Sequence, residues 1–204
     1  MRQTVHVSWC GVITPDGLPG EAAAALRHVL GGRERLLGHR HPDTIAARVS
    51  LAHACQQSGQ VKEAIALGRR TLADQERTYG PGHPETIAAA TSLASAYRSA
   101  KKRKDALHLY ERVITEREHG QGPDHPDTIA ARGDLALAYL AAGKLAVAVA
   151  QYERAVADAE RVLGHTHPTT ESARRALQEA GDYAWAVLGI DLRKAQPRTR
   201  TDTH

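Results

Sequence analysis

Apolar residues recur along this chain at helical spacing, in three successive stretches of similar sequence. Counted from a threonine that opens each stretch, leucine stands at the seventh position, alanine at the eighth, and cysteine or tyrosine at the eleventh. This spacing places the three side chains on one face of a helix. The positions are Leu51, Ala52 and Cys55, then Leu93, Ala94 and Tyr97, then Leu135, Ala136 and Tyr139.

A second helical pattern follows each of these stretches. An alanine stands twenty residues after the opening threonine, and further apolar residues continue the helical face beyond it. Short segments rich in small or polar residues separate the first pattern from the second, at Ser58-Gly59, Ala100-Lys101 and Ala142-Gly143. Each unit therefore predicts a helix, a tight turn and a second helix.

The units repeat with a period of 42 residues. His-Pro pairs begin at positions 41, 83, 125 and 167, and glycine and glutamate recur ahead of them at the same interval. Glycine past a helix end adopts positive φ without steric cost, and proline in the first turn of the next helix loses no hydrogen bond. The acidic residue and threonine that follow would supply negative charge and a side-chain oxygen to the free N–H groups. We therefore assign structural turn or cap roles to Glu76, Gly80, His83, Pro84, Thr86, Glu118, His125, Pro126 and Thr128.

The repeated glutamate is unusual, because a carboxylate in the last turn of a helix opposes the helix macrodipole. Some neighbour must offset that cost. We expect Glu76 to reach His83, or the open N–H groups at Glu85-Thr86, with its counterparts doing the same in their own units. These counterparts are Glu34, Glu118 and Glu160.

These positions together resemble the tetratricopeptide repeat, and the 42-residue period with its His-Pro-x-Thr string is similar to the kinesin light chain branch of that family. The resemblance implies an all-α fold of the α-solenoid class, a right-handed superhelix of antiparallel helix pairs. The composition agrees, because phenylalanine is absent and alanine and leucine dominate the apolar set, which suits closely packed helices. The abundance of alanine and arginine suggests a bacterial source.

The repeat divides the chain into seven segments. An irregular segment over residues 1–19 precedes the second helix of an incomplete unit over 20–37. Complete repeats cover 38–79, 80–121 and 122–163. A degenerate repeat over 164–190 would act as a capping helix, with Trp185, Val187 and Leu188 closing the last groove, and residues 191–204 form a basic tail expected to be disordered.

The resemblance also implies that the first helices line a concave groove. It points Ser50, His53, Gln57, Ser92, Ser95, Arg98, Ser99, Asp134, Leu137 and Leu140 into that groove. These side chains are mostly small and neutral, with an apolar patch at the last two leucines. Such a groove suits an extended or helical peptide better than a polyanion. The paired asparagines of the light-chain pattern are replaced by Val49-Ser50, Thr91-Ser92 and Gly133-Asp134.

Charge and cysteine content indicate which partners and which cellular compartment to expect. The net charge is +4, and part of it belongs to the last fourteen residues, so the rest of the chain is close to neutral. Only Lys101–Lys104 forms a dense basic run, which we interpret as a solvated turn, with a phosphate contact as the alternative. Nucleic acid is therefore an unlikely partner. Two isolated cysteines, no run of ~20 apolar residues and no signal-peptide pattern indicate a cytoplasmic protein.

No residue pattern predicts a catalytic, metal or phosphate-binding site. His39 and His41, and likewise His165 and His167, have the spacing of a metal pair, but one histidine of each pair belongs to the turn and no cysteine or carboxylate cluster completes a site. Gly31-Gly32 lacks the Lys-Ser/Thr of a phosphate loop. We therefore expect no cofactor, no metal and no enzymatic activity. The leading hypothesis is a scaffold that binds a peptide or protein segment in its groove. The alternative is a sensor or regulatory subunit for a bacterial signalling ATPase or transcription regulator supplied by another chain.

Overall fold

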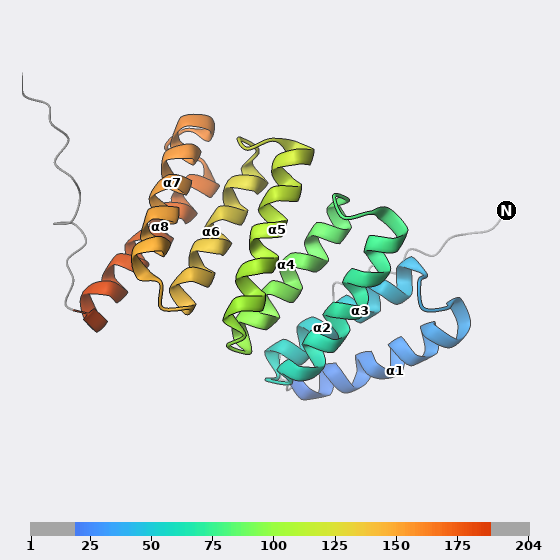
Figure 1. The fold of residues 1–204 in the computed structure, drawn as a ribbon. Coiled ribbons are helices and arrows are strands. Elements are labelled where there is room, and N and C mark those ends of the chain that lie inside the picture. The colour runs from blue at the N-terminus through green and yellow to red at the C-terminus, as the bar shows by residue number, and fades with distance from the viewer. Residues whose placement is uncertain (1–18, 189–204) are drawn as a thin grey trace, which may run out of the picture. The chain divides into compact units, whose positions relative to one another are not determined.

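A computed structural model describes residues 19–188, with side chains from 20 to 183, and this part of the chain forms eight α-helices and no strand (Figure 1). The predicted irregular segment over 1–19 and the basic tail over 191–204 lie outside the described residues, apart from Pro19. So do the side chains of Trp185, Val187 and Leu188. The helices are α1 (Pro19–Leu37), α2 (Pro42–Gln57), α3 (Val61–Tyr79), α4 (Pro84–Ser99), α5 (Arg103–Gln121), α6 (Pro126–Ala141), α7 (Leu145–Leu163) and α8 (Pro168–Leu188).

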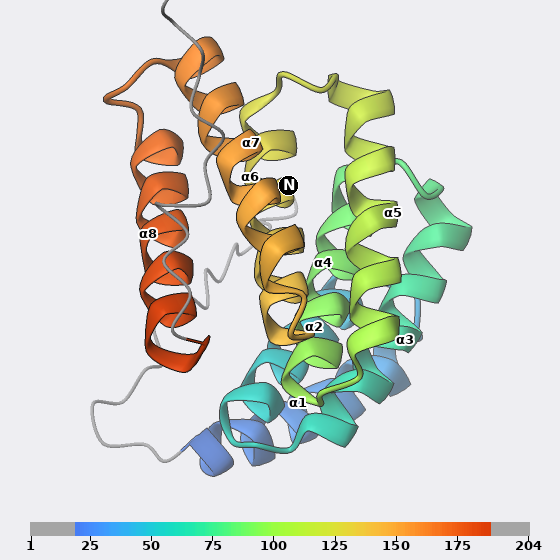
Figure 2. The same ribbon diagram turned by 60° about the vertical axis from the view of Figure 1, so that its left-hand side comes forward.

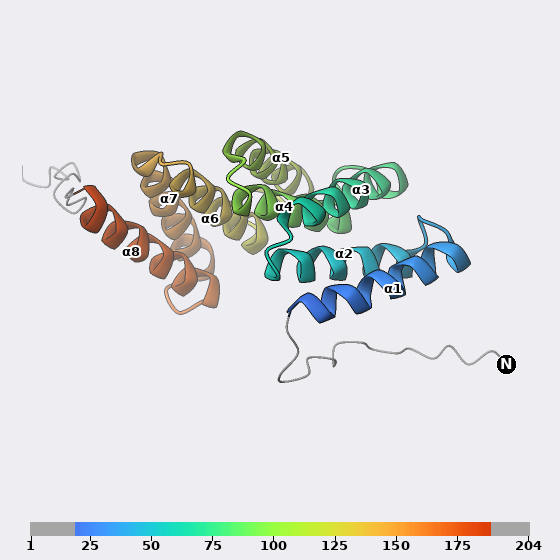
Figure 3. The ribbon, with the colours of Figure 1, turned by 90° about the horizontal axis from the view of Figure 1, so that it is seen from below.

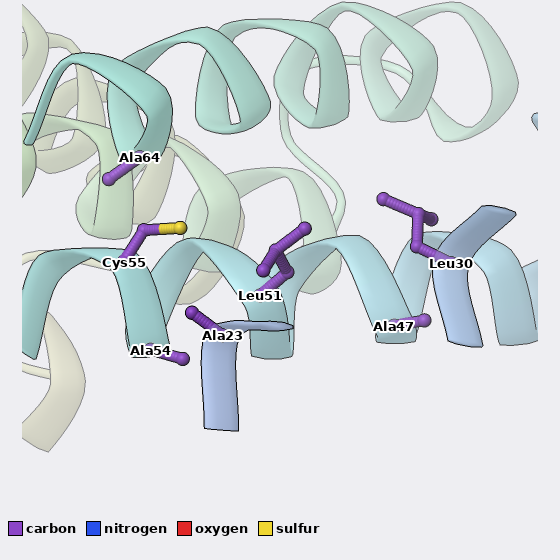
Figure 4. Packing of buried hydrophobic residues seen from close by; sticks show 7 residues of the cluster. All are labelled: Ala23, Leu30, Ala47, Leu51, Ala54, Cys55 and Ala64. Atoms are coloured by element: carbon purple, nitrogen blue, oxygen red, sulfur yellow. The ribbon is translucent and has the colours of Figure 1, made fainter. Parts of the chain in front are cut away.

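The chain divides into two compact units, which are described separately. The first ends at Leu67 and contains α1, α2 and the first turns of α3. Helix α1 packs along α2 (Figure 3). Small side chains dominate the core between them, which lets the helix backbones approach closely. Figure 4 shows the cluster: Ala23, Leu30, Ala47, Leu51, Ala54, Cys55 and Ala64.

The second unit begins at Gly68 and contains the rest of α3 and helices α4 to α8. Each helix from α4 onward packs on the next one in the chain, and α6 also contacts α8 (Figure 2). Gly68 permits α3 to approach α4, because a Cβ there would lie 3.1 Å from Leu93 Cδ1. The predicted helix, turn and helix of each repeat correspond to α2–α3, α4–α5 and α6–α7.

A glycine with positive φ ends each helix that precedes a His-Pro pair. The φ angles are 86° at Gly38 and Gly80, 91° at Gly122 and 87° at Gly164. At the last two, ψ is 162° and 169°, an extended region that only glycine occupies without strain. Each glycine N–H still donates to the carbonyl of the repeated glutamate four residues earlier, at 3.0–3.2 Å. The glycine therefore turns the chain and closes the helix.

Histidine, rather than the acidic residue or threonine, caps the next helix. The Nδ1 atom of His83 accepts from the backbone N–H of Glu85 at 3.3 Å, and the other three turns repeat this bond at 3.2 Å. The threonine is buried in all four turns. In two of them it donates backwards, since Thr128 Oγ1 lies 2.9 Å from the carbonyl oxygen of Gly122 and Thr170 makes the same bond, whereas the Oγ1 atoms of Thr44 and Thr86 have no hydrogen-bond partner among the described residues. The expectation that threonine serves the free N–H groups is therefore wrong, because its position in the first turn faces the preceding chain.

The repeated glutamate pairs with arginine, and not with the capping histidine. Arg132 Nη2 lies 2.9 Å from Glu118 Oε1, and the same pairing joins Arg48 to Glu34 and Arg174 to Glu160. Alanine occupies this arginine position in the second repeat, and there Glu76 contacts Arg112 of α5 at 2.6 Å. The expected contact with His83 is thus replaced by an ion pair to a neighbouring helix. The arginine charge offsets the unfavourable position of the carboxylate at the helix end.

The short turn inside each repeat also needs positive φ, at Gly59 (75°), Gly143 (76°) and Lys101 (58°). Lysine adopts this conformation at a steric cost that glycine avoids. The second repeat therefore contains a strained residue where the other two have glycine.

Removal of Arg132 should destabilise the protein far more than removal of Arg112. Arg132 is almost fully buried and binds both Glu118 and Asp158, whereas Arg112 is about one-third exposed. We expect Arg132→Ala to lower the free energy of unfolding by about 2–3 kcal/mol, because it leaves Glu118 without its arginine and removes the closest of the cations that pair with Asp158. Arg112→Ala should cost less than about 1 kcal/mol. Urea titration of both variants tests this, and equal losses would contradict it.

Lys101→Gly should stabilise the protein by about 0.5–1 kcal/mol, because it relieves the strain of positive φ. The matched change Gly143→Ala introduces the same strain and should lower the free energy of unfolding by about 1 kcal/mol. Melting temperatures measured by circular dichroism should therefore shift in opposite directions. A shift of the same sign in both variants would count against this explanation.

Candidate functional site

The structure places the predicted groove residues on the first helix of each repeat. Ser50, His53 and Gln57 are exposed on α2, within the first compact unit. The others belong to the second unit, where α4 carries Ser92, Ser95, Arg98 and Ser99, and α6 carries Asp134, Leu137 and Leu140.

A cleft in the second unit lies between α6 and α8, with α7 as its floor. Its volume is about 460 Å³. Two of the predicted residues, Asp134 and Leu137, line it, and Tyr152 and Ala155 of α7 form the floor. The remaining lining residues are Ile129, Ala130, Gly133, Pro168, Thr169, Ser172, Ala173 and Ala176.

Small residues on the two facing helices create this space. Ala130 and Gly133 on α6 lie opposite Ala173 and Ala176 on α8, and a Cβ added at Gly133 would have nothing within 4 Å. The groove residues predicted from the sequence are polar side chains and two leucines, so these four small apolar residues were missed. The repeat pattern could have identified three of them, because Ala130, Gly133 and Ala176 occupy positions that the family resemblance directs into the groove.

The predicted apolar patch at Leu137 and Leu140 divides between the cleft and the core. Leu137 lines the cleft while packing against the cluster that contains Tyr152. Leu140 packs against the same cluster and also with Leu145, Val149 and Leu177, at the junction of α6, α7 and α8, and it does not line the cleft. Leu140 therefore stabilises the helix stack, and Leu137 is the leucine available to a ligand in the cleft.

One carboxyl group gives the cleft its polarity. Desolvation by the surrounding atoms raises the pKa of Asp134 above its usual range, while the positive charges of Arg98 and Arg117 act in the opposite direction. Burial likewise raises the pKa of the Tyr152 hydroxyl on the floor, and the charge of Asp134 adds to this shift. Asp134 is nevertheless exposed, so a hydrogen-bond donor or cation from a ligand can reach its carboxyl group beside an apolar surface.

The hydroxyl groups near the groove are largely occupied by their own helices. Ser50 Oγ donates to the Ala46 carbonyl at 3.1 Å, Ser99 Oγ to the Ser95 carbonyl at 3.1 Å, and Thr91 Oγ1 to the Ile87 carbonyl at 2.9 Å. Such bonds lower the cost of leaving a hydroxyl without a ligand partner. On α4, Arg98 differs, because its Nε atom is buried with no hydrogen-bond partner.

The arrangement suits binding. Within the part of the chain whose side chains are described, no three histidine, cysteine, aspartate or glutamate side chains cluster as metal ligands would. No described helix is both long and apolar enough to cross a membrane. The α6–α8 cleft itself offers apolar surface, one carboxyl group and open access, which are the features of a recognition site for a side chain of another molecule.

Family models identify the repeats. Two models of the tetratricopeptide repeat match the chain, one over residues 46–118 and the other over 16–43 and 128–169. Together they cover most of the sequence. The search of curated proteins found no match.

Solved structures agree with this assignment. The chain is 29% identical to a protein of Podosopora anserina described as a kinesin light chain with nearly identical TPR-like repeats, with a TM-score of 0.70 and 90% of each chain covered. A point variant of that protein has the same identity and a TM-score of 0.72, over 84% of this chain and 81% of that chain. BtubC (BKLC) from P. vanneervenii is 16% identical, with a TM-score of 0.63 over 93% of this chain and 80% of that chain, and shows the fold alone. These matches and the eight helices confirm the all-α, α-solenoid class.

Gly133→Ala should stabilise the protein, because the added methyl group meets open space and alanine forms helix better than glycine does. We expect the free energy of unfolding to rise by about 0.5–1 kcal/mol, measured by urea titration. A loss of stability would show that the side of α6 at Gly133 is closed, and that the cleft does not exist as described.

Proposed function

Because this chain belongs to the tetratricopeptide repeat family, with repeats like those of kinesin light chains, we propose that it is a non-catalytic scaffold that binds a peptide or protein segment in its groove. Tetratricopeptide repeats generally mediate protein–protein interaction, and the fold is generally non-catalytic. Beyond this family property, we assign binding to one surface of the second unit. That surface is the α6–α8 cleft and the exposed residues of the first helices beside it.

The α6–α8 cleft is the main structural support for this function. Its volume of about 460 Å³ accommodates a large apolar side chain, and its walls of alanine and glycine bring backbone close to the ligand. Apolar anchors that fill such pockets dominate the affinity of protein interfaces. We therefore expect the bound segment to insert one apolar side chain between α6 and α8.

Asp134 would add direction to this contact. Asp134 lines the cleft and is exposed, so a backbone N–H or a basic side chain from the ligand can reach its carboxyl group and form a charge-assisted hydrogen bond there. A segment with a basic or N–H donor group near its apolar anchor satisfies both features. A carboxylate in the same place would be repelled.

Filling the cleft should weaken binding without unfolding the protein. Gly133→Leu places a side chain into the open space beside α6, while Gly120→Leu is a matched control on α5, also a helical glycine with nothing within 4 Å. Peptides would be selected from a displayed random library on the wild-type protein. We expect Gly133→Leu to lower the affinity for the selected peptides at least about tenfold, measured by fluorescence anisotropy. Gly120→Leu should bind the peptides with the affinity of the wild type.

The two variants also serve in affinity capture from native lysate with quantitative mass spectrometry. Partners that use the cleft should be recovered by the wild type and Gly120→Leu and lost with Gly133→Leu. Melting temperatures close to that of the wild type would show that both variants are folded. Recovery of the same partners in equal amounts by all three proteins would remove the cleft from consideration.

A further inference from the structure

We propose that a basic edge of the second unit docks an acidic segment of a partner protein. The basic edge consists of Lys101, Lys102, Arg103, Lys104 and Lys144, all exposed. None of these residues lines the α6–α8 cleft, so this inference does not rest on the proposed function and names a second, separate surface.

Two successive turns bring these cations together. The turn between α4 and α5 supplies four of them and the turn between α6 and α7 supplies Lys144, and both turns lie at the same end of the helices in Figures 1 and 2. The guanidinium of Arg103 connects the turns directly, because its Nε donates to the carbonyl oxygen of Ala141 at 3.1 Å. The charges therefore form one cluster.

The helix ends beneath the cluster add to its positive potential. Lys102 and Lys144 are the N-cap residues of α5 and α7, and neither side chain forms a capping hydrogen bond. Backbone N–H groups of a helix start carry partial positive charge, which acidic side chains in the first turn usually offset. Helix α7 has no acidic residue in its first turn, and α5 has only Asp105. The five cations thus meet little local compensation.

Two tyrosines hold lysines at this edge. Lys102 Nζ lies 5.8 Å from the centre of the Tyr97 ring, and Lys144 Nζ lies 5.6 Å from that of Tyr139. These contacts orient the ammonium groups, which lowers the entropy lost when a carboxylate binds. They also occupy ring faces that a single-stranded nucleic acid would need for base stacking. The edge therefore fits a run of aspartate or glutamate better than a polynucleotide.

Binding would be electrostatic and strongly dependent on salt. Each exposed carboxylate–ammonium pair contributes little by itself, and several must act together for measurable affinity. Such contacts between exposed charges are screened as ionic strength rises, whereas insertion of an apolar side chain into the cleft is not. The salt dependence thus separates the two surfaces.

The test uses a fluorescein-labelled decaglutamate peptide and the full chain in fluorescence anisotropy at low and physiological salt. The edge variant combines Lys101→Gln, Lys104→Gln and Lys144→Gln. The control variant, Arg69→Gln with Arg77→Gln and Arg154→Gln, removes the same charge from exposed positions on α3 and α7. We expect the edge variant to bind the peptide about tenfold more weakly than the wild type, with affinity almost unchanged in the control. Circular dichroism confirms that both variants are folded.

Three outcomes would overturn the proposal. The first is failure of the wild type to bind decaglutamate at low salt. The second is an equal loss of affinity in both variants, which would assign binding to overall charge. The third is tighter binding of an oligothymidylate of the same length, which would make the edge a nucleic-acid site. The Gly133→Leu variant should bind decaglutamate as the wild type does, so that failure of the cleft and failure of the edge are distinguishable.

Discussion

The turn between repeats is the constraint on which the structure depends. In each of four turns a glycine with φ of 86–91° directs the chain away from one helix, and a histidine Nδ1 accepts the first free N–H of the next. The glycine N–H also closes the preceding helix on the carbonyl of the repeated glutamate. Because these bonds are local, every turn has the same geometry, and successive helix pairs start at the same point of the repeat. Because every repeat needs the same glycine and His-Pro residues at its turn, these residues recur in the sequence every 42 positions.

Ion pairs then connect each helix end to its neighbour. The repeated glutamate would weaken its own helix, but an arginine from the next helix, or Arg112 in the second repeat, brings a positive charge to it. The two proposed binding surfaces lie where the repeats differ. The groove position of Gly133 holds Val49, Thr91 and Arg175 in the other units, and only the glycine leaves the space that forms part of the cleft. The lysine run at the turn after α4 is likewise confined to one repeat.

Much of the fold could be predicted from the sequence, because periodicity and turn chemistry are local properties. The spacing of Leu93, Ala94 and Tyr97 and the repeated Gly and His-Pro residues indicated the helices and the turns between them. The partners of the repeated glutamate could not be predicted in this way, since Arg132 lies on another helix and its ion pair depends on packing. A structural role of His83 in the turn was predicted, but its Nδ1 atom was not expected to be the N-cap acceptor in place of the acidic residue and threonine, because histidine is not a usual N-cap residue.

The site was harder to predict than the fold. Leu137 and Leu140 are alike in sequence, and only three-dimensional packing shows that Leu137 lines the cleft while Leu140 packs at the junction of three helices. The α6–α8 cleft is defined by small residues such as Gly133 and Ala173, and a search for side chains with chemistry overlooks residues whose contribution is space.

Two glycines near the end of α5 test the central role of the turn most directly. Gly122 has φ of 91°, while Gly120 is an ordinary helical residue two positions earlier, and an added Cβ meets nothing within 4 Å at either position. We predict that Gly122→Ala lowers the free energy of unfolding by about 1–3 kcal/mol in urea titration, because its backbone conformation excludes a side chain. Gly120→Ala should raise it, by up to about 1 kcal/mol. Equal effects of the two substitutions would contradict the account.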